Sequence, residues 1–202
     1  MKLYYSPGAC SQSPHIIARE AGLAIDIIRV DLRTKQTEKG EDYRTINPLG
    51  QVPFLVLGDG STLSEGSAIA QYLADQAPTK GLMPAVGNFD RYKVQQWQSF
   101  VGSELHKGCY TPLFNPQTAA ETRAQALEML QSRMAHVARQ LDGREYLVGK
   151  QMTAADVYLW VTMNWAHGLK VDLSKLPNLA AYHQRISARP AVQAALKAEG
   201  LI

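Results

Sequence analysis

The stretch "KLYYSPGACSQSPHIIAREAG" (residues 2–22) decides the fold of the first half of the chain. Residues 2–5 predict a short β-strand, and residues 11–21 predict a helix that Gly22 ends. Pro14 favours a helix start nearby, because a proline in the first turn removes only an N–H group that lacks a partner there. Ser11 or Ser13 is expected to cap this helix. The stretch therefore predicts a strand that turns directly into a helix.

Strand and helix signals continue to residue 77. "IDIIRVDL" (25–32) predicts a second strand, and Tyr43 marks a short helix. "PFLVL" (53–57) and "STLS" (61–64) flank a Gly-Asp-Gly turn, which is typical of a hairpin. A helix follows, with four apolar residues on one face: Ala68, Ile69, Tyr72 and Leu73. A β-α-β unit followed by a hairpin and a helix predicts a small mixed sheet.

The composition changes after residue 77, and the rest of the chain predicts helices only. Residues 78–87 contain two prolines and two glycines and are expected to form a linker. Residues 88–202 are then expected to form an all-α domain, with helices at 88–108, 119–141, 154–167, 177–188 and 191–199. In "MTAADVYLW" (152–160), Thr153 and Asp156 predict a capping box at the start of a central helix.

Length and composition narrow the class of protein. The chain has 202 residues, 46% of them hydrophobic and 19% charged, with a net charge of +3. Lysines and arginines are scattered, so nucleic acid is not an expected partner. The first residues lack the apolar core of a signal peptide, and no apolar run reaches the roughly 18 residues of a membrane span. Two cysteines and no targeting segment favour a reducing cytoplasm.

Cys10 lies just before the predicted helix at 11–21. Unpaired backbone N–H groups and the positive end of a helix dipole favour a thiolate over a thiol there. Ser13 stands where a dithiol redox protein would have a second cysteine, so Cys10 has no neighbour that would resolve a mixed disulfide. The alternative is that Cys10 is a small apolar residue without chemistry.

Three further stretches suggest binding or chemistry, each with a structural alternative. Val52-Pro53, in "NPLGQVPFL", opens a strand as a cis bond that exposes the Val52 backbone, or as an ordinary trans proline. Glu65 and Ser67 begin a helix that would hold a ligand's carboxylate and ammonium groups, or have no ligand. His106 is a candidate acid, base or donor near neutral pH. Cys109 is interpreted as structural, and the histidine spacings predict no metal site.

Taken together, "YYSPGACSQSPH", "NPLGQVP", "SEGSAI" and "ELHKG" resemble the glutathione transferases, and the cysteine resembles the bacterial beta class. The resemblance covers the whole chain. It implies a thioredoxin-like α/β domain at residues 1–77, an all-α domain at 88–202, and a homodimer. The co-substrate it implies is glutathione, with no metal, and the second substrate is a hydrophobic electrophile.

The resemblance also implies a role for each matching residue. Cys10 would face the glutathione sulfur, and Val52 would bind the cysteinyl backbone with Pro53 in cis. Glu65, Gly66 and Ser67 would hold the γ-glutamyl end, and Lys35 the glycyl carboxylate. His106 would lie near the sulfur. Glu104 would reach the partner subunit's glutathione, whereas Ser99 replaces a longer asparagine and is expected to lose that contact or make it through water.

Conjugation of glutathione to hydrophobic electrophiles is the main function that the sequence predicts. Glutathione-dependent reduction of disulfides or peroxides through Cys10 is the alternative enzymatic function. A non-enzymatic carrier of hydrophobic ligands is the alternative from another class. The second-substrate pocket is expected to draw on scattered side chains such as Tyr5, Phe114 and Trp165.

Overall fold

The computed structural model describes all of residues 1–202, and its contacts divide the chain into two compact units. The N-terminal unit contains residues 1–83 and 188–202, and the helical unit contains residues 84–187. The border after Met83 falls inside the stretch that the sequence predicts as a linker.

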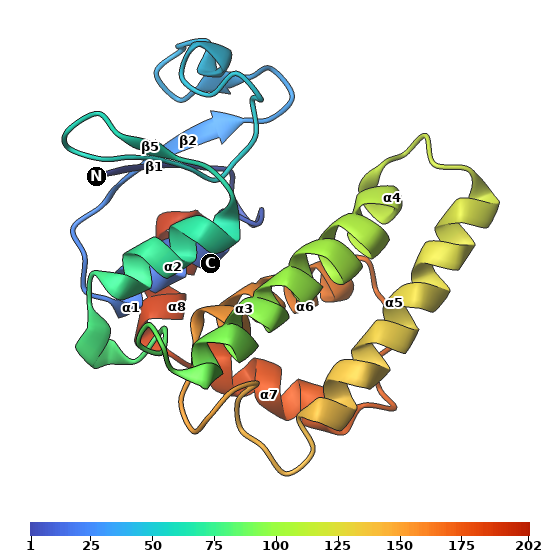
Figure 1. Ribbon diagram of the computed structural model, residues 1–202. Helices are drawn as coiled ribbons and strands as arrows, with labels where there is room; N and C mark the ends of the chain where they lie inside the picture. The colour runs from blue at the N-terminus through green and yellow to red at the C-terminus, as the bar shows by residue number, and fades with distance from the viewer. The chain divides into compact units, whose positions relative to one another are not determined.

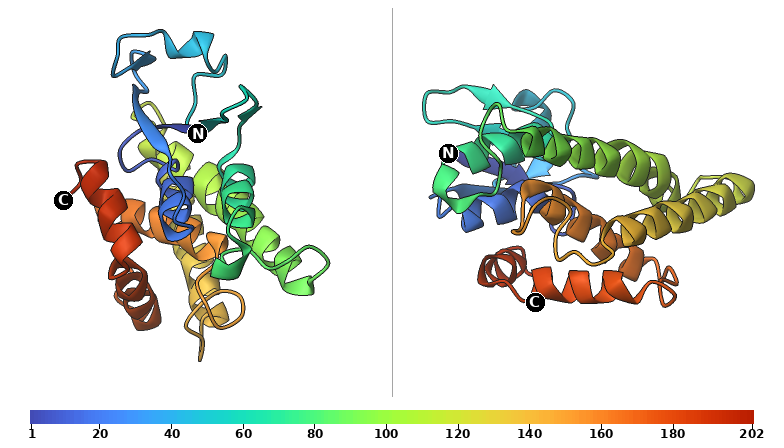
Figure 2. Two further views of the ribbon diagram at one scale, coloured as in Figure 1. Left: turned by 90° about the vertical axis from the view of Figure 1, so that its left-hand side faces the viewer. Right: turned by 60° about the horizontal axis from the view of Figure 1, so that its bottom comes forward.

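The last helix belongs to the N-terminal unit, although the sequence-based boundaries group it with the other late helices. This helix, α8 (Pro190–Ala198), packs against α1 (Gln12–Glu20), and Figure 2 shows the two side by side. Arg189, which precedes α8, forms two hydrogen bonds of 2.6 and 2.8 Å with Glu20 at the end of α1. Contacts in space, which the order of helices along the chain does not reveal, therefore place residues 188–202 in this unit.

The N-terminal unit contains the predicted mixed sheet (Figure 1). Its five strands are β1 (Lys2–Tyr5), β2 (Asp26–Asp31), β3 (Gln36–Thr37), β4 (Phe54–Val56) and β5 (Thr62–Leu63). Their order is β3-β2-β1-β4-β5; only β1 and β2 run parallel. Strand β3 was not predicted from the sequence, because two residues are too few to show an alternating pattern.

Alternation along β1 and β4 gives the sheet two buried faces. Leu3 pairs with Leu55, and Tyr4 pairs with Phe54, so each pair lies on one face. Tyr4 and Phe54 pack with Tyr43 from the 3-10 helix η1 (Tyr43–Thr45). Helices α1 and α2 (Gly66–Asp75) cover the opposite face, and a second 3-10 helix, η2 (Pro78–Lys80), follows α2 (Figure 1).

The helical unit contains no strand. Its elements are α3 (Phe89–Phe100), η3 (Val101–Tyr110), α4 (Thr111–Phe114), α5 (Ala120–Gln140), α6 (Ala154–Gly168) and α7 (Pro177–Ser187). Helix α6 is buried on nearly all sides, as its largely apolar sequence predicts. None of the helices in the chain is both long and apolar enough to cross a membrane.

The predicted capping box at the start of α6 is present. The Asp156 carboxylate is buried and accepts hydrogen bonds of 2.8–2.9 Å from Leu147 N, Thr153 N, Thr153 Oγ1 and Tyr182 Oη. Burial raises the pKa of this carboxyl, and the four hydrogen bonds oppose that rise. Asp156 therefore fixes the loop before α6 and a tyrosine of α7 at the same point.

The helix predicted at 88–108 is only partly an α-helix. After Phe100 the backbone widens into the π-helix η3, in which residues five apart become neighbours. Gly108 permits this, because a Cβ atom there would lie 3.0 Å from the Ser103 carbonyl oxygen. Cys109 Sγ accordingly donates to the Glu104 carbonyl, five residues earlier, at 3.0 Å. The α-helical spacing assumed from the sequence therefore does not hold for residues 101–110.

Candidate active site

Cys10 lies in the turn between β1 and α1. Its half-buried thiol donates a hydrogen bond of 3.3 Å to the Val52 carbonyl oxygen. The prediction that Ser11 or Ser13 caps α1 is wrong. Ser11 Oγ instead bonds to Ser6 N and Ser6 O, and Ser13 Oγ is buried without a hydrogen-bond partner. Ser11 thus closes the turn that holds Cys10 and does not cap the helix.

The Val52–Pro53 peptide bond is cis, as the resemblance implies. The preceding residue is held in place, because Tyr43 Oη and Asn47 Nδ2 each donate to the Gln51 carbonyl at 2.8 Å. Val52 lies against Cys10, because the Cys10 thiol donates to the Val52 carbonyl oxygen. Two stretches that are 42 residues apart in sequence therefore meet at the thiol.

The start of α2 lies beside Pro53. A Cβ atom on Gly66 would lie 3.4 Å from the proline ring, so a glycine lets the helix begin this close. Glu65, just before α2, has a φ of 65°, and its carboxylate makes no capping hydrogen bond. Glu65 is exposed, while Gly66 and Ser67 are half-buried. Unpaired N–H groups of the first turn therefore remain near an accessible acid.

Lys35 lies on the loop after β2, with a φ of 59°. Its Nζ donates a 2.9 Å hydrogen bond to the Gly50 carbonyl, two residues before Val52. Lys35, Val52, Pro53, Gly66 and Cys10 are thus connected through contacts within the N-terminal unit. This unit accordingly has a cation, a helix start, an acid and a thiol around one loop.

The other predicted site residues lie in the helical unit. Ser99, on α3, is exposed, and its carbonyl accepts a hydrogen bond from Ser103 Oγ at 2.8 Å. Glu104, on η3, forms an ion pair with Arg133 of α5 at 2.9 Å. The Nε and Nη2 groups of Arg133 both contact the same Glu104 oxygen, Oε2. The second carboxylate oxygen of Glu104 therefore stays available to another donor.

His106 lies on η3 among aromatic rings. Its Nδ1 is 2.8 Å from Tyr158 Oη, and the Trp165 ring meets it edge-on with 4.8 Å between centroids. Burial, together with the charge of Lys107, lowers the pKa of His106 to about 4. The imidazole is therefore neutral at pH 7 and offers a hydrogen-bond donor or acceptor rather than a charge.

An aromatic cluster extends from His106. Trp165 contacts Tyr110 and Phe114, whose rings stack with 5.8 Å between centroids. Phe114 and Trp165, two of the side chains expected in the second-substrate pocket, are thus in contact. Tyr5 lies in the N-terminal unit, where it is buried and packs against His15. Tyr110 and Tyr158 were missed because an aromatic residue on an apolar helix gives the same sequence signal as a core residue.

Cys109 is buried, which raises its pKa to about 11. The side chain therefore stays a thiol at neutral pH and is a structural residue, as the sequence suggests.

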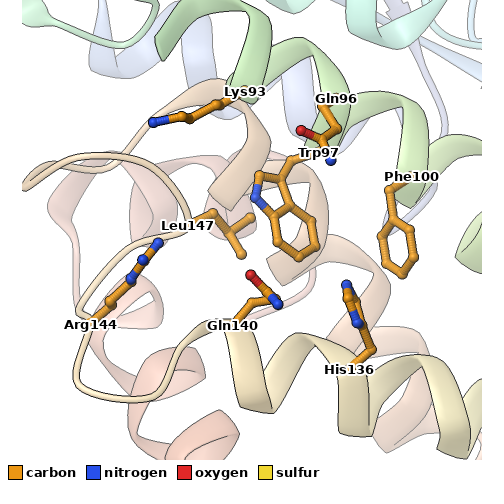
Figure 3. A pocket seen from close by; sticks show the side chains of 8 residues that line it. All are labelled: Lys93, Gln96, Trp97, Phe100, His136, Gln140, Arg144 and Leu147. Atoms are coloured by element: carbon orange, nitrogen blue, oxygen red, sulfur yellow. The ribbon is translucent and has the colours of Figure 1, made fainter.

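A pocket of about 360 Å³ lies elsewhere in the helical unit, between α3 and α5 and the loop after α5 (Figure 3). Trp97, Phe100 and His136 form its aromatic wall, with rings 5.4–6.0 Å apart. Its other lining residues are Lys93, Gln96, Gln140, Arg144 and Leu147. None of the residues predicted from the sequence lines this pocket. The structure also contains no group of three or more acidic, histidine or cysteine side chains that would hold a metal ion.

Two family models match the chain. The N-terminal domain of glutathione S-transferases matches residues 8–76, and the C-terminal domain of the same family matches residues 103–199. The chain belongs to the glutathione transferase family. It is an enzyme of this family, with glutathione as its co-substrate. The family match also identifies the mixed sheet with its helices as the thioredoxin-like domain and confirms the predicted fold class.

Individual glutathione transferases are similar to this chain over their whole length. Glutathione S-transferase GstA from Escherichia coli O157:H7 is 44% identical, with all of both chains covered. A sphingomonad glutathione S-transferase in complex with glutathione is 47% identical, with a TM-score of 0.96 and both chains fully covered. A beta-class glutathione S-transferase from Sphingomonas chungbukensis is 44% identical, with a TM-score of 0.96 and the same coverage. This transferase therefore resembles the beta class in sequence and in fold.

Proposed function

We propose that this transferase joins the sulfur of glutathione to hydrophobic electrophiles and thereby detoxifies them. The observation that carries the proposal is the Cys10 thiol against the Val52 carbonyl, beside a cis proline and the start of α2. In this reaction the glutathione thiolate forms a bond to an electrophilic carbon, and the leaving group departs with its electron pair. The protein needs only to favour the thiolate and to hold the two reactants together.

Glutathione would bind along the loop of the N-terminal unit. The Val52 backbone would pair with the cysteinyl residue, and the N–H groups of Gly66 and Ser67 would hold the γ-glutamyl carboxylate. Glu65 would pair with the ammonium group. Lys35 uses one of its three ammonium N–H groups in the hydrogen bond to the Gly50 carbonyl. It would donate the other two to the glycyl carboxylate.

The aromatic cluster around His106 would receive the hydrophobic electrophile. Trp165 and Phe114 offer ring faces and edges of the kind that bind flat apolar groups. His106 is neutral at pH 7, which supports a role as a hydrogen-bond partner of the sulfur rather than as a counter-charge. Conjugation of a model aryl halide in the presence and absence of glutathione tests the proposed activity directly.

Glu65→Ala is expected to weaken glutathione binding about tenfold, because the ligand's ammonium loses its carboxylate partner. Because Glu65 is exposed, its replacement by alanine is expected to change the stability of the folded protein little. Titration calorimetry measures the affinity, and Glu38→Ala, which removes another exposed acid of the same unit, is the control. An unchanged dissociation constant in Glu65→Ala would refute the assignment.

The enzyme is proposed to be a cytoplasmic homodimer in which Glu104 reaches the glutathione of the partner. The second Glu104 oxygen, which Arg133 does not use, supports this contact. Ser99 is shorter than the asparagine it replaces, so its own contact with the partner's glutathione would be lost or made through water.

Sedimentation at micromolar concentration is expected to give about twice the chain mass of 22.3 kDa. Glu104→Gln is expected to keep the dimer, since Arg133 would still have an oxygen acceptor. The variant is expected to bind glutathione more weakly, because the carboxylate that reaches the partner's glutathione is lost. A fully active monomer would contradict both the dimer and the role of Glu104.

Thiol-disulfide exchange is a second candidate function, favoured by the half-buried Cys10 thiol at the start of α1. The Cys10 thiolate would attack one sulfur of glutathione disulfide, the S–S bond would break, and one glutathione would leave as a thiolate. The mixed disulfide left on Cys10 would be released by an external thiol, because Ser13 provides none.

A further inference from the structure

A buried polar network joins the end of α8 to the turn that holds Cys10. Glu199 follows α8, and its side chain is fully buried. Its Oε2 accepts hydrogen bonds from Gly8 N at 3.0 Å and from Gln12 Nε2 at 3.1 Å. Its Oε1 lies 2.8 Å from His15 Nδ1. One carboxylate therefore binds a backbone N–H two residues before Cys10 and two side chains of α1.

The direction of these hydrogen bonds is fixed by Arg19. Its Nε donates to His15 Nε2 at 2.8 Å, so that ring nitrogen is an acceptor. The ring proton is then on Nδ1 and is donated to Glu199. Glu199 consequently accepts from three donors and has no freedom to turn without leaving one of them unsatisfied in the interior.

Gly8 is the point at which this network touches the active-site turn. Its φ is 68°, a conformation that glycine adopts without strain. The turn is closed from within by the hydrogen bonds of Ser11 with Ser6 and by Ala9 N to Ser6 O at 3.1 Å. Glu199 holds the same turn from the other side, because it binds Gly8 N. The turn thus has two independent anchors.

We propose that Glu199 is a positioning residue for the active site: its buried carboxylate sets the place of the Gly8–Cys10 turn and, with it, of the thiol and the first turn of α1. This inference rests on the proposed role of Cys10 and the α1 start toward glutathione. The Glu199 carboxylate, which lies near the end of the chain, thereby helps to hold the site around Cys10.

A purely structural role for Glu199 would be to tie α8 to α1, and the chain contains a matched pair for that role. Arg189 and Glu20 tie the same two helices at the opposite end of α1, through hydrogen bonds of 2.6 and 2.8 Å. Glu20 forms its hydrogen bonds with Arg189 and none with the turn at residues 6–11. Glu20→Gln therefore weakens the α1–α8 contact without touching the turn that holds Cys10.

Glu199→Gln is the informative variant. Glutamine has one acceptor oxygen, and the His15 Nδ1–H group requires it, since Arg19 occupies the other ring nitrogen. The amide NH2 group of the new side chain then faces Gly8 N–H, and two donors meet. The size of the side chain is kept while the hydrogen bond to Gly8 is lost.

Three measurements on the full-length protein test the proposal. Calorimetry counts glutathione-binding sites and gives the dissociation constant. Aryl halide conjugation gives kcat per binding site, so that unfolded molecules do not contribute. Amide hydrogen exchange followed by NMR reports on Gly8. Thermal melts establish that Glu199→Gln and Glu20→Gln are compared as folded proteins.

Glu199→Gln is expected to lower kcat per site by about tenfold, with the glutathione dissociation constant changed by less than about twofold, because a displaced turn disturbs the sulfur and not the ends of the peptide. Gly8 exchange is expected to accelerate by at least about tenfold. Glu20→Gln is expected to change none of these. Equal effects in both variants, or unchanged kcat and Gly8 exchange in Glu199→Gln, would overturn the proposal.

Two further outcomes keep the test decisive. If Glu199→Gln does not fold, wild-type exchange decides: Gly8 must exchange as slowly as the amides inside α1, and exchange as fast as in an exposed turn would refute the anchor. If the wild type binds no glutathione, the proposed glutathione site fails. Gly8 exchange in Glu199→Gln then still decides whether Glu199 holds the turn.

Discussion

Cys10→Ala is expected to abolish glutathione-dependent disulfide exchange and to leave conjugation of a model aryl halide at a measurable fraction of the wild-type rate. Exchange needs a protein thiolate as nucleophile, and the chain has only two cysteines. The other, Cys109, is buried with its pKa raised to about 11, so it does not substitute at neutral pH.

Conjugation differs because the attacking sulfur belongs to glutathione. The backbone groups at the start of α1 and the anchors at Ser11 and Glu199 all remain in Cys10→Ala. The backbone groups are expected to keep stabilising the glutathione thiolate after the cysteine side chain is removed, because the two anchors still hold the turn in place.

His106→Ala is the matched variant, with the opposite expectation. It should lower conjugation more than glutathione affinity and leave disulfide exchange largely intact, because the ring is assigned to the sulfur during conjugation. Both reactions are measured for both variants in one buffer. Complete loss of both activities in Cys10→Ala, with glutathione binding intact, would show that conjugation also requires this thiol.

Asp156→Ala is expected to cause the largest loss of stability among the substitutions considered, about 3 kcal/mol. The change removes the capping box and leaves buried donors from Leu147, Thr153 and Tyr182 without an acceptor. For a chain of this size the melting temperature should fall by about 6–12 °C. Scanning calorimetry measures the change.

The glutathione site should be unaffected in the folded Asp156→Ala protein, since Asp156 bonds only within the helical unit. Glu128→Ala, on the exposed side of α5, is the control and should change stability by less than about 0.5 kcal/mol. A variant with normal stability and a selectively altered Michaelis constant for glutathione would contradict the structural assignment.

Features that depend on neighbouring residues were predictable from the sequence. The capping box needs only Thr153 and Asp156, three residues apart, and the β4–β5 hairpin needs only its Gly-Asp-Gly turn. The cis bond before Pro53 followed from the joint resemblance of several stretches, because base rates for one proline favour trans.

Features that depend on distant residues were not predictable in the same way. Nothing near Cys10 indicates that Ser11 turns back to Ser6, that the thiol reaches Val52, or that Glu199 binds Gly8. The π-helix η3 escaped prediction because its widening depends on Gly108 approaching Ser103, whereas the apolar spacing also fits an α-helix. The exposure of Glu65 is set by the conformation just before α2, which the sequence does not specify.

The return of residues 188–202 to the N-terminal unit has a consequence for the order in which the chain folds during synthesis. Residues 84–187 form a continuous segment, so the helical unit has all its parts before α8 has been made. The sheet and α1 are synthesised first, yet they lack Arg189 and Glu199 until the ribosome has translated another hundred or so residues. The N-terminal unit is thus begun first and completed last. The turn that holds Cys10 acquires its second anchor, Glu199, only then.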